Sequence, residues 1–217
     1  MRNYIAEFIG TFALVFCGTG AIIIDQQYGG AITHAGVSIT FGLIIMSMIY
    51  ALGDISGAHL NPAVSIAFVI KKVFPVQQLP GYVAGQLGGA LAASFTLKLL
   101  FANNKYLGAT MPAGADLQSF VLEMIMSFFL MLVIINVAEG SKEKGMFAGL
   151  AIGAVVGLEA MFGGPVSGAS MNPARSIAPA LVSGHAEHLW LYVIAPIVGA
   201  VAAVPVCNYL SFKTKET

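Results

Sequence analysis

Hydrophobic residues fall into six long runs and two short runs along the chain. The long runs cover about Tyr4–Ile24, Ala35–Leu52, Leu79–Phe101, Leu117–Ala138, Met146–Phe162 and Leu189–Leu210. An α-helix needs roughly 20 apolar residues to cross a bilayer. The short runs, about Pro62–Ile70 and Pro173–Val182, follow the second and fifth long runs and are too short to cross. The pattern predicts an all-α membrane protein with six transmembrane helices and two re-entrant half-helices.

A twelve-residue segment occurs twice, and its second half opens each short run. The copies are Ser56-Gly57-Ala58-His59-Leu60-Asn61-Pro62-Ala63-Val64-Ser65-Ile66-Ala67 and Ser167-Gly168-Ala169-Ser170-Met171-Asn172-Pro173-Ala174-Arg175-Ser176-Ile177-Ala178, identical at nine positions. Asn followed by Pro marks a helix start. The Asn side chain caps the helix, and Pro is tolerated at the first helical position because the N–H that it lacks would have no partner within the helix. Two unrelated helix caps are the alternative interpretation. Their repetition in a membrane chain favours half-helices that begin inside the bilayer.

The runs are arranged as three spans plus a half-helix, twice, over about 1–101 and 117–211. An odd number of spans per repeat makes the second repeat enter the membrane from the opposite side, which is an inverted 3+3 repeat. Irregular backbone at that depth persists only where it is buried in protein or lines a wet cavity. We therefore expect a single transmembrane domain over 1–217, with the two polar loops lining a cavity.

Composition agrees with this class. Of the 217 residues, 58% are hydrophobic and 9% are charged, whereas about 25% are charged in an ordinary soluble domain. The net charge is zero, so no nucleic-acid partner is indicated. The first apolar run is expected to be a retained span rather than a signal peptide. Cys17 and Cys207 are expected to be free thiols, and no metal-ligand spacing is present.

Basic residues are concentrated on one side of the predicted topology. One set of connections holds Arg2, Lys71, Lys72, Lys142, Lys144, Lys213 and Lys215, whereas the other holds Lys105, with Lys98 near that end of the third span. Basic residues favour the cytoplasmic side. We expect a multi-pass protein of the cell inner (plasma) membrane with both termini in the cytoplasm.

Polar side chains at the two half-helix starts point to a site at the bilayer midplane. Each helix N-terminus carries about half a positive charge, and Asn61 and Asn172 add amide donors there. The pair disfavours cations and offers two hydrogen bonds to one neutral molecule, a means of pore selectivity that the aquaporin type exemplifies. Arg175 is the basic residue within a half-helix. It is expected to line a narrow part of the pore, with a buried structural ion pair as the alternative.

Further ionisable residues are expected at membrane depth, among them two glutamates and a histidine. Glu7 and Glu123 stand at matching places in the first spans of the two repeats. We expect them to accept hydrogen bonds from loop N–H groups, with proton relay as the weaker alternative. His59 has no counterpart in the second copy, where Ser170 stands. It is expected either to line the cytoplasmic half of the pore or to be a hydrogen-bonded loop residue.

The boxes Asn61-Pro62-Ala63 and Asn172-Pro173-Ala174, with the opening Ala6-Glu7-Phe8-Ile9-Gly10-Thr11, resemble those of the major intrinsic protein family, the aquaporins and glycerol facilitators. The resemblance covers essentially the whole chain. It implies an aquaporin-like fold, one pore per subunit and a homotetramer. It also implies an outer selectivity filter, which spacing from the boxes assigns to Phe41, Ala160, Ala169 and Arg175.

The filter combines features of different branches of the family. Strict water channels typically place His where this chain has Ala160, whereas Phe41 matches the water-channel pattern. The run from Gly164 to Met171 resembles the nodulin-like branch, which is associated with glycerol and metalloid hydroxides as well as water. We expect a representative of the bacterial or archaeal type.

The sequence thus predicts a passive channel for water and small uncharged solutes, such as glycerol and metalloid hydroxides, that excludes protons and ions. The expected partners are those solutes, the lipid bilayer and three further copies of the chain, with no cofactor. An ion-coupled secondary transporter shares the inverted repeat, and a structural membrane protein with a closed pore is a further alternative. No nucleophile–base set or metal cluster repeats near the boxes, so an enzyme is not expected.

Overall fold

The structure, a computed structural model, describes residues 1–138 and 145–212, and in these ranges the chain is helical with connecting loops. The long helices are α1 (Arg2–Gln27), α2 (Thr33–Ser56), α4 (Leu79–Leu100), α5 (Asp116–Ala138), α7 (Ala148–Ser167) and α9 (Leu189–Phe212). Two short helices are α3 (Pro62–Ile70) and α8 (Pro173–Ser183), and a 3₁₀ turn, η1 (Val76–Gln78), precedes α4. The predicted all-α architecture is confirmed.

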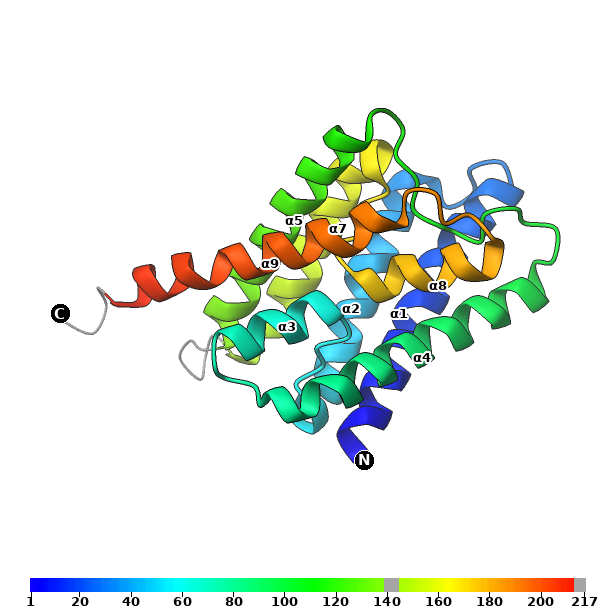
Figure 1. The fold of residues 1–217 in the computed structure, drawn as a ribbon. Coiled ribbons are helices and arrows are strands. Elements are labelled where there is room, and N and C mark those ends of the chain that lie inside the picture. Colours follow the sequence, from blue (N-terminus) through cyan, green and yellow to red (C-terminus); the bar gives the residue numbers. More distant parts are fainter. Residues whose placement is uncertain (139–144, 213–217) are drawn as a thin grey trace.

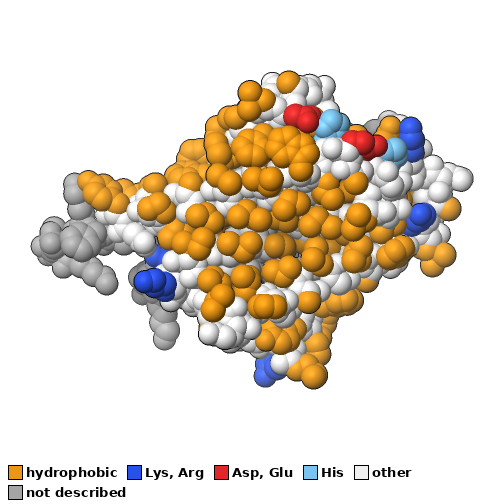
Figure 2. Space-filling model, viewed as in Figure 1, with side chains coloured by type: hydrophobic (Ala, Val, Ile, Leu, Met, Phe, Trp, Pro, Cys, Tyr) orange, Lys and Arg blue, Asp and Glu red, His pale blue; other side chains and the backbone are white. Residues whose placement is uncertain are grey.

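The six long helices account for the membrane spans. Within the described residues, six helices are long and apolar enough to cross a membrane. Figure 2 shows hydrophobic side chains over the middle of the visible face, with lysine and arginine toward the two ends of the molecule. Of the basic residues used to predict orientation, Lys142, Lys144, Lys213 and Lys215 lie outside the described residues.

Two spans extend further than their apolar runs. The runs were expected to end near Leu52 and Phe162, but α2 and α7 continue to Ser56 and Ser167. Glycine and polar residues end the hydrophobic run before the helix itself ends. The next residue caps each helix: Gly57 and Gly168 adopt left-handed φ angles of 81° and 84°. Glycine takes this conformation without steric cost, so the chain can turn sharply toward the half-helix.

Helix contacts repeat across the two halves of the chain. α1 packs on α2 and α4 as α5 packs on α7 and α9, and α3 and α8 each contact both α4 and α9. In Figure 1, α3 and α8 lie between α4 and α9 with their N-terminal ends turned toward the middle of the bundle. Further contacts join equivalent helices of the two halves, α2 with α7 and α3 with α8. This is the pairing expected of two inverted repeats related by a pseudo-two-fold axis.

The α2–α7 crossing is unusually close because glycine stands at its centre. Gly42 and Gly153 occur at the same spacing before Ser56 and Ser167, and they face each other. A Cβ on Gly42 would stand 2.6 Å from the Gly153 carbonyl oxygen, and a Cβ on Gly153 would stand 2.6 Å from that of Gly42. Small residues allow such backbone approach between membrane helices. The two helices that carry Phe41 and Ala160 are therefore held at a short separation.

Candidate functional site

Both half-helices begin with the same asparagine cap. The side-chain oxygen of Asn61 accepts a hydrogen bond from the Ala63 N–H at 2.9 Å, and that of Asn172 accepts one from the Ala174 N–H at 3.0 Å. Pro62 and Pro173 occupy the first helical position. α3 has 9 residues and α8 has 11, so at 1.5 Å per residue each spans about 15 Å, half of a bilayer core. Each half-helix thus reaches from one membrane face to the midplane.

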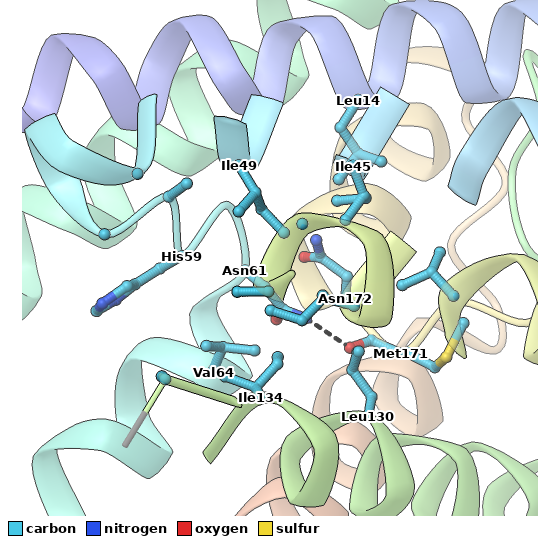
Figure 3. A pocket seen from close by; sticks show the side chains of 18 of the residues that line it. Leu14, Ile45, Ile49, His59, Asn61, Val64, Leu130, Ile134, Met171 and Asn172 are labelled. Atoms are coloured by element: carbon cyan, nitrogen blue, oxygen red, sulfur yellow. Dashed lines mark hydrogen bonds between the residues drawn. The ribbon is translucent and has the colours of Figure 1, made fainter. Parts of the chain in front are cut away.

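The two caps are linked to each other by reciprocal hydrogen bonds. The Asn61 amide donates to the Met171 carbonyl at 2.7 Å, and the Asn172 amide donates to the Leu60 carbonyl at 2.8 Å. Figure 3 shows Asn61 and Asn172 close together within one cavity, among apolar side chains such as Leu14, with a dashed line to Met171. Each amide group has two N–H bonds, and one of them is used in this exchange. The second is available to a molecule in the cavity.

The loop before each half-helix contains strained backbone. Leu60 and Met171, at equivalent positions, have left-handed φ angles of 51° and 53°. A non-glycine residue in this region costs about 1–2 kcal/mol. Strain of this size persists only where surrounding contacts hold the conformation in place.

The buried glutamates supply those contacts. Glu7 accepts hydrogen bonds from the N–H groups of His59 at 2.9 Å and Leu60 at 2.7 Å. Glu123 accepts from the N–H groups of Ser170 at 2.8 Å and Met171 at 2.7 Å. Both carboxyl groups are completely buried. Each carboxyl also accepts a hydrogen bond from a serine hydroxyl at 2.7 Å, Glu7 from Ser56 and Glu123 from Ser167. These contacts to loop N–H groups are the ones that a loop-supporting role requires.

His59 and its counterpart Ser170 make equivalent bonds from their loops to a serine of the half-helix that follows. His59 Nδ1 lies 3.0 Å from the Ser65 hydroxyl, and the Ser170 hydroxyl lies 2.5 Å from that of Ser176. The His59 ring also contacts aromatic rings, with centroids 4.8 Å from Phe74 and 5.0 Å from Tyr82, and it lines the cavity in Figure 3. His59 therefore makes a side-chain hydrogen bond and also lines this cavity.

Two cavities, of about 330 Å³ (the inner cavity) and 470 Å³ (the outer cavity), share four lining residues, which we call the neck. The first is lined by the asparagine pair and His59. The second is lined by residues that include Asp25, near the end of α1, and Tyr106, in the loop after α4. The residues that line both cavities are Phe41, Ala160, Ala169 and Arg175. These are the four residues that the family resemblance assigns to the filter, and the structure brings them together from α2, α7, the second loop and α8.

Arg175 is 2% exposed, and its described contacts include no ion pair. Its Nη1 donates to the Gly108 carbonyl at 2.8 Å, and its guanidinium lies 5.1 Å from the centre of the Phe41 ring. Its Nε is buried without a hydrogen-bond partner among the described residues. An arginine held by a carbonyl and a ring presents fixed donors to the neck between the cavities.

Sequence reasoning missed several supporting residues. The Tyr82 hydroxyl donates to the Ser56 carbonyl at 2.7 Å and the Tyr192 hydroxyl to the Ser167 carbonyl at 2.5 Å, so the two helix ends are held in the same way. The repetition of these tyrosines in the third spans of the repeats was the available signal. Gly108 gave none, because a backbone carbonyl has no sequence signature.

Comparisons with known proteins agree with this geometry. A family model described as "Major intrinsic protein" matches residues 1–206. The chain is 49% identical to Aquaporin NIP1-1 of Zea mays over 99% of this chain and 77% of that protein. It is 46% identical to Nodulin-26 of Glycine max over 99% of this chain and 80% of that protein. Among solved structures, the aquaglyceroporin from Plasmodium falciparum matches with a TM-score of 0.82 and 27% identity, covering 96% of this chain and 98% of that one.

Proposed function

The chain belongs to the major intrinsic protein family, and from this premise we propose that it is a passive channel for water and small uncharged solutes. The observation that carries the proposal is the pair of cavities joined at Phe41, Ala160, Ala169 and Arg175, with Asn61 and Asn172 side by side in the inner cavity. Together they form a path in which Asn61, Asn172 and Arg175 present fixed donors. Such a path suits neutral molecules that accept hydrogen bonds.

Proton and cation exclusion follows from the two half-helix starts. Each N-terminus contributes about half a positive charge, and the two meet at the asparagine pair. A water that accepts from the second N–H of both Asn61 and Asn172 has its lone pairs occupied. It then cannot accept a proton from its neighbour in the file. Arg175 adds a full positive charge at the neck, so cations meet two successive electrostatic barriers.

Solute range depends on the neck. Ala160 contributes only a methyl group to the wall of the neck, where an imidazole would occupy more space and add a polar group. The neck is therefore bounded by one charged, one aromatic and two small residues. We propose that it admits glycerol-like solutes in addition to water, with metalloid hydroxides as candidates of similar size and polarity.

We extend the proposal to the assembly and its setting. The chain is proposed to act as one transmembrane domain in a homotetramer of the plasma membrane, with one pore per subunit and both termini in the cytoplasm. The exposed apolar side chains of α2 and α7, including Leu43 at 51% and Leu158 at 67% exposure, support burial against lipid or a neighbouring subunit. Crosslinking of the purified protein in detergent, read as bands of one to four subunits, tests the tetramer.

A proteoliposome swelling assay tests the function. Vesicles with purified protein should shrink in sucrose and swell in glycerol faster than empty vesicles, with no dependence on a proton or sodium gradient. Flux equal to that of empty vesicles would end the proposal. Flux that stops when an ion gradient is collapsed would favour an ion-coupled transporter instead.

A further inference from the structure

The proline in α7 leaves one backbone carbonyl near the filter without its usual partner. Pro165 lies inside α7, and proline has no N–H. In an α-helix the N–H of residue 165 would donate to the carbonyl of Met161. Met161 directly follows Ala160, which lines the neck between the cavities. The carbonyl that proline releases is thus one peptide unit from the filter.

A side chain from α2 takes the place of the missing N–H. His34 Nε2 lies 2.8 Å from the Met161 carbonyl oxygen. A carbonyl only accepts hydrogen bonds, so Nε2 must carry the proton. The imidazole therefore completes a bond that the helix cannot make for itself, between residues 127 positions apart in the sequence.

The site is built to receive this ring. A Cβ on Gly164 would stand 2.6 Å from His34 Cε1, so glycine is what leaves room for the imidazole against α7. At the start of α2, the Asp25 carboxyl accepts from the N–H groups of Ile32 at 3.0 Å and Thr33 at 2.6 Å, which fixes the backbone just before His34. Asp25, His34 and Gly164 all line the outer cavity.

The bond lies at the outer end of the α2–α7 contact. At the centre of the crossing, Gly42 faces Gly153, and one turn outward on each helix a Cβ on Gly157 would stand 3.5 Å from the Ser38 carbonyl. A further turn outward on each helix brings the contact to His34 and Met161. Phe41 lies on α2 and Ala160 on α7, between the glycine contact and the histidine bridge. The distance between Phe41 and Ala160 is thus limited by a contact between α2 and α7 on each side of the pair, the glycine contact on one side and the histidine bridge on the other.

We propose that His34 is a positioning residue for solute selection: by bonding the carbonyl that Pro165 releases, it holds α7 against α2 and so limits the width between Phe41 and Ala160. The inference rests on the proposed channel function. Release of the bridge lets the outer end of α7 move away from α2. Glycerol, which fills the neck more completely than water, gains most from this movement.

The test uses a matched pair of variants in proteoliposomes. His34→Gln keeps an amide donor that reaches the carbonyl, whereas His34→Leu keeps similar bulk without a donor. The ratio of glycerol to water permeability should stay close to wild type in His34→Gln. In His34→Leu it should rise on the order of fivefold, the factor by which losing one ordinary hydrogen bond shifts an equilibrium.

Pro165→Ala provides a second, independent arm. Residue 165 then has an N–H that satisfies the Met161 carbonyl within α7, so His34→Leu should have little effect on the ratio or on thermal unfolding in this background. If His34→Leu fails to accumulate alone, the double variant should restore folded protein. Equal effects of His34→Leu in both backgrounds, failure of the double variant to accumulate, or equal ratios for His34→Gln and His34→Leu would overturn the inference. A wild-type protein that conducts neither solute is the distinct result that overturns the channel itself.

Discussion

Replacing Glu123 by Gln is expected to destabilise the second loop by an amount that the hydrogen-bond geometry bounds. One carboxyl oxygen of Glu123 accepts from the Ser167 hydroxyl at 2.7 Å and the Ser170 N–H at 2.8 Å, and the other accepts from the Met171 N–H at 2.7 Å. A glutamine has one oxygen, and its amide nitrogen only donates. The best placement keeps the oxygen at the position with two donors. The Met171 N–H then faces another donor.

One buried N–H without an acceptor costs about 1–3 kcal/mol. The opposite placement also leaves one backbone N–H, that of Ser170, facing a donor, because the Ser167 hydroxyl can turn to accept from the amide, so this value is expected for either placement. The consequence reaches the pore because the Met171 carbonyl accepts from the Asn61 amide. We therefore expect both a lower free energy of unfolding and a lower water permeability per folded protein.

The measurement is thermal unfolding of the purified protein in detergent, followed by stopped-flow shrinkage of proteoliposomes at matched protein content. Glu187→Gln is the matched control, because that side chain is 61% exposed and its replacement should change stability by less than about 0.5 kcal/mol. If Glu123→Gln unfolds at the same temperature as Glu187→Gln, the loop does not depend on the carboxyl, and the reasoning is wrong.

Three further outcomes are expected. Ala160→His should narrow the neck and reduce glycerol flux more than water flux in the swelling assay; an equal loss of both would contradict the filter assignment. Arg175→Ala should increase the leak of protons and cations, measured with a pH-sensitive dye inside vesicles, and an unchanged leak would mean that the guanidinium does not face the path. Gly153→Val should prevent close approach of α2 and α7, because its Cβ would meet the Gly42 carbonyl oxygen at 2.6 Å. A large loss of folded protein is expected, whereas Gly53→Ala, with no atom within 4 Å of the added Cβ, should be tolerated; equal yields would refute the crossing geometry.

Elements whose cause is local could be predicted from the sequence. Asn followed by Pro defines a helix start wherever it occurs, and the starts of α3 and α8 at Pro62 and Pro173 are as predicted. Hydrophobic runs gave the number of spans but not their ends. The ends of α2 and α7 depend on a left-handed glycine and on a tyrosine hydroxyl from another helix, and neither contributes to hydrophobicity.

The pattern of long and short hydrophobic runs, together with the repeated twelve-residue segment, predicted the inverted architecture and the two half-helices, and the repeated boxes with the Ala6–Thr11 opening pointed to the family. Contacts between the repeats were decided only in three dimensions. The exchange between Asn61 and the Met171 carbonyl and the bridge between His34 and the Met161 carbonyl join residues more than 100 positions apart. Such pairs are set by helix crossing and register rather than by local propensity. One partner is in each case a backbone carbonyl, which every residue carries, so only the packed structure shows which side chain reaches which carbonyl.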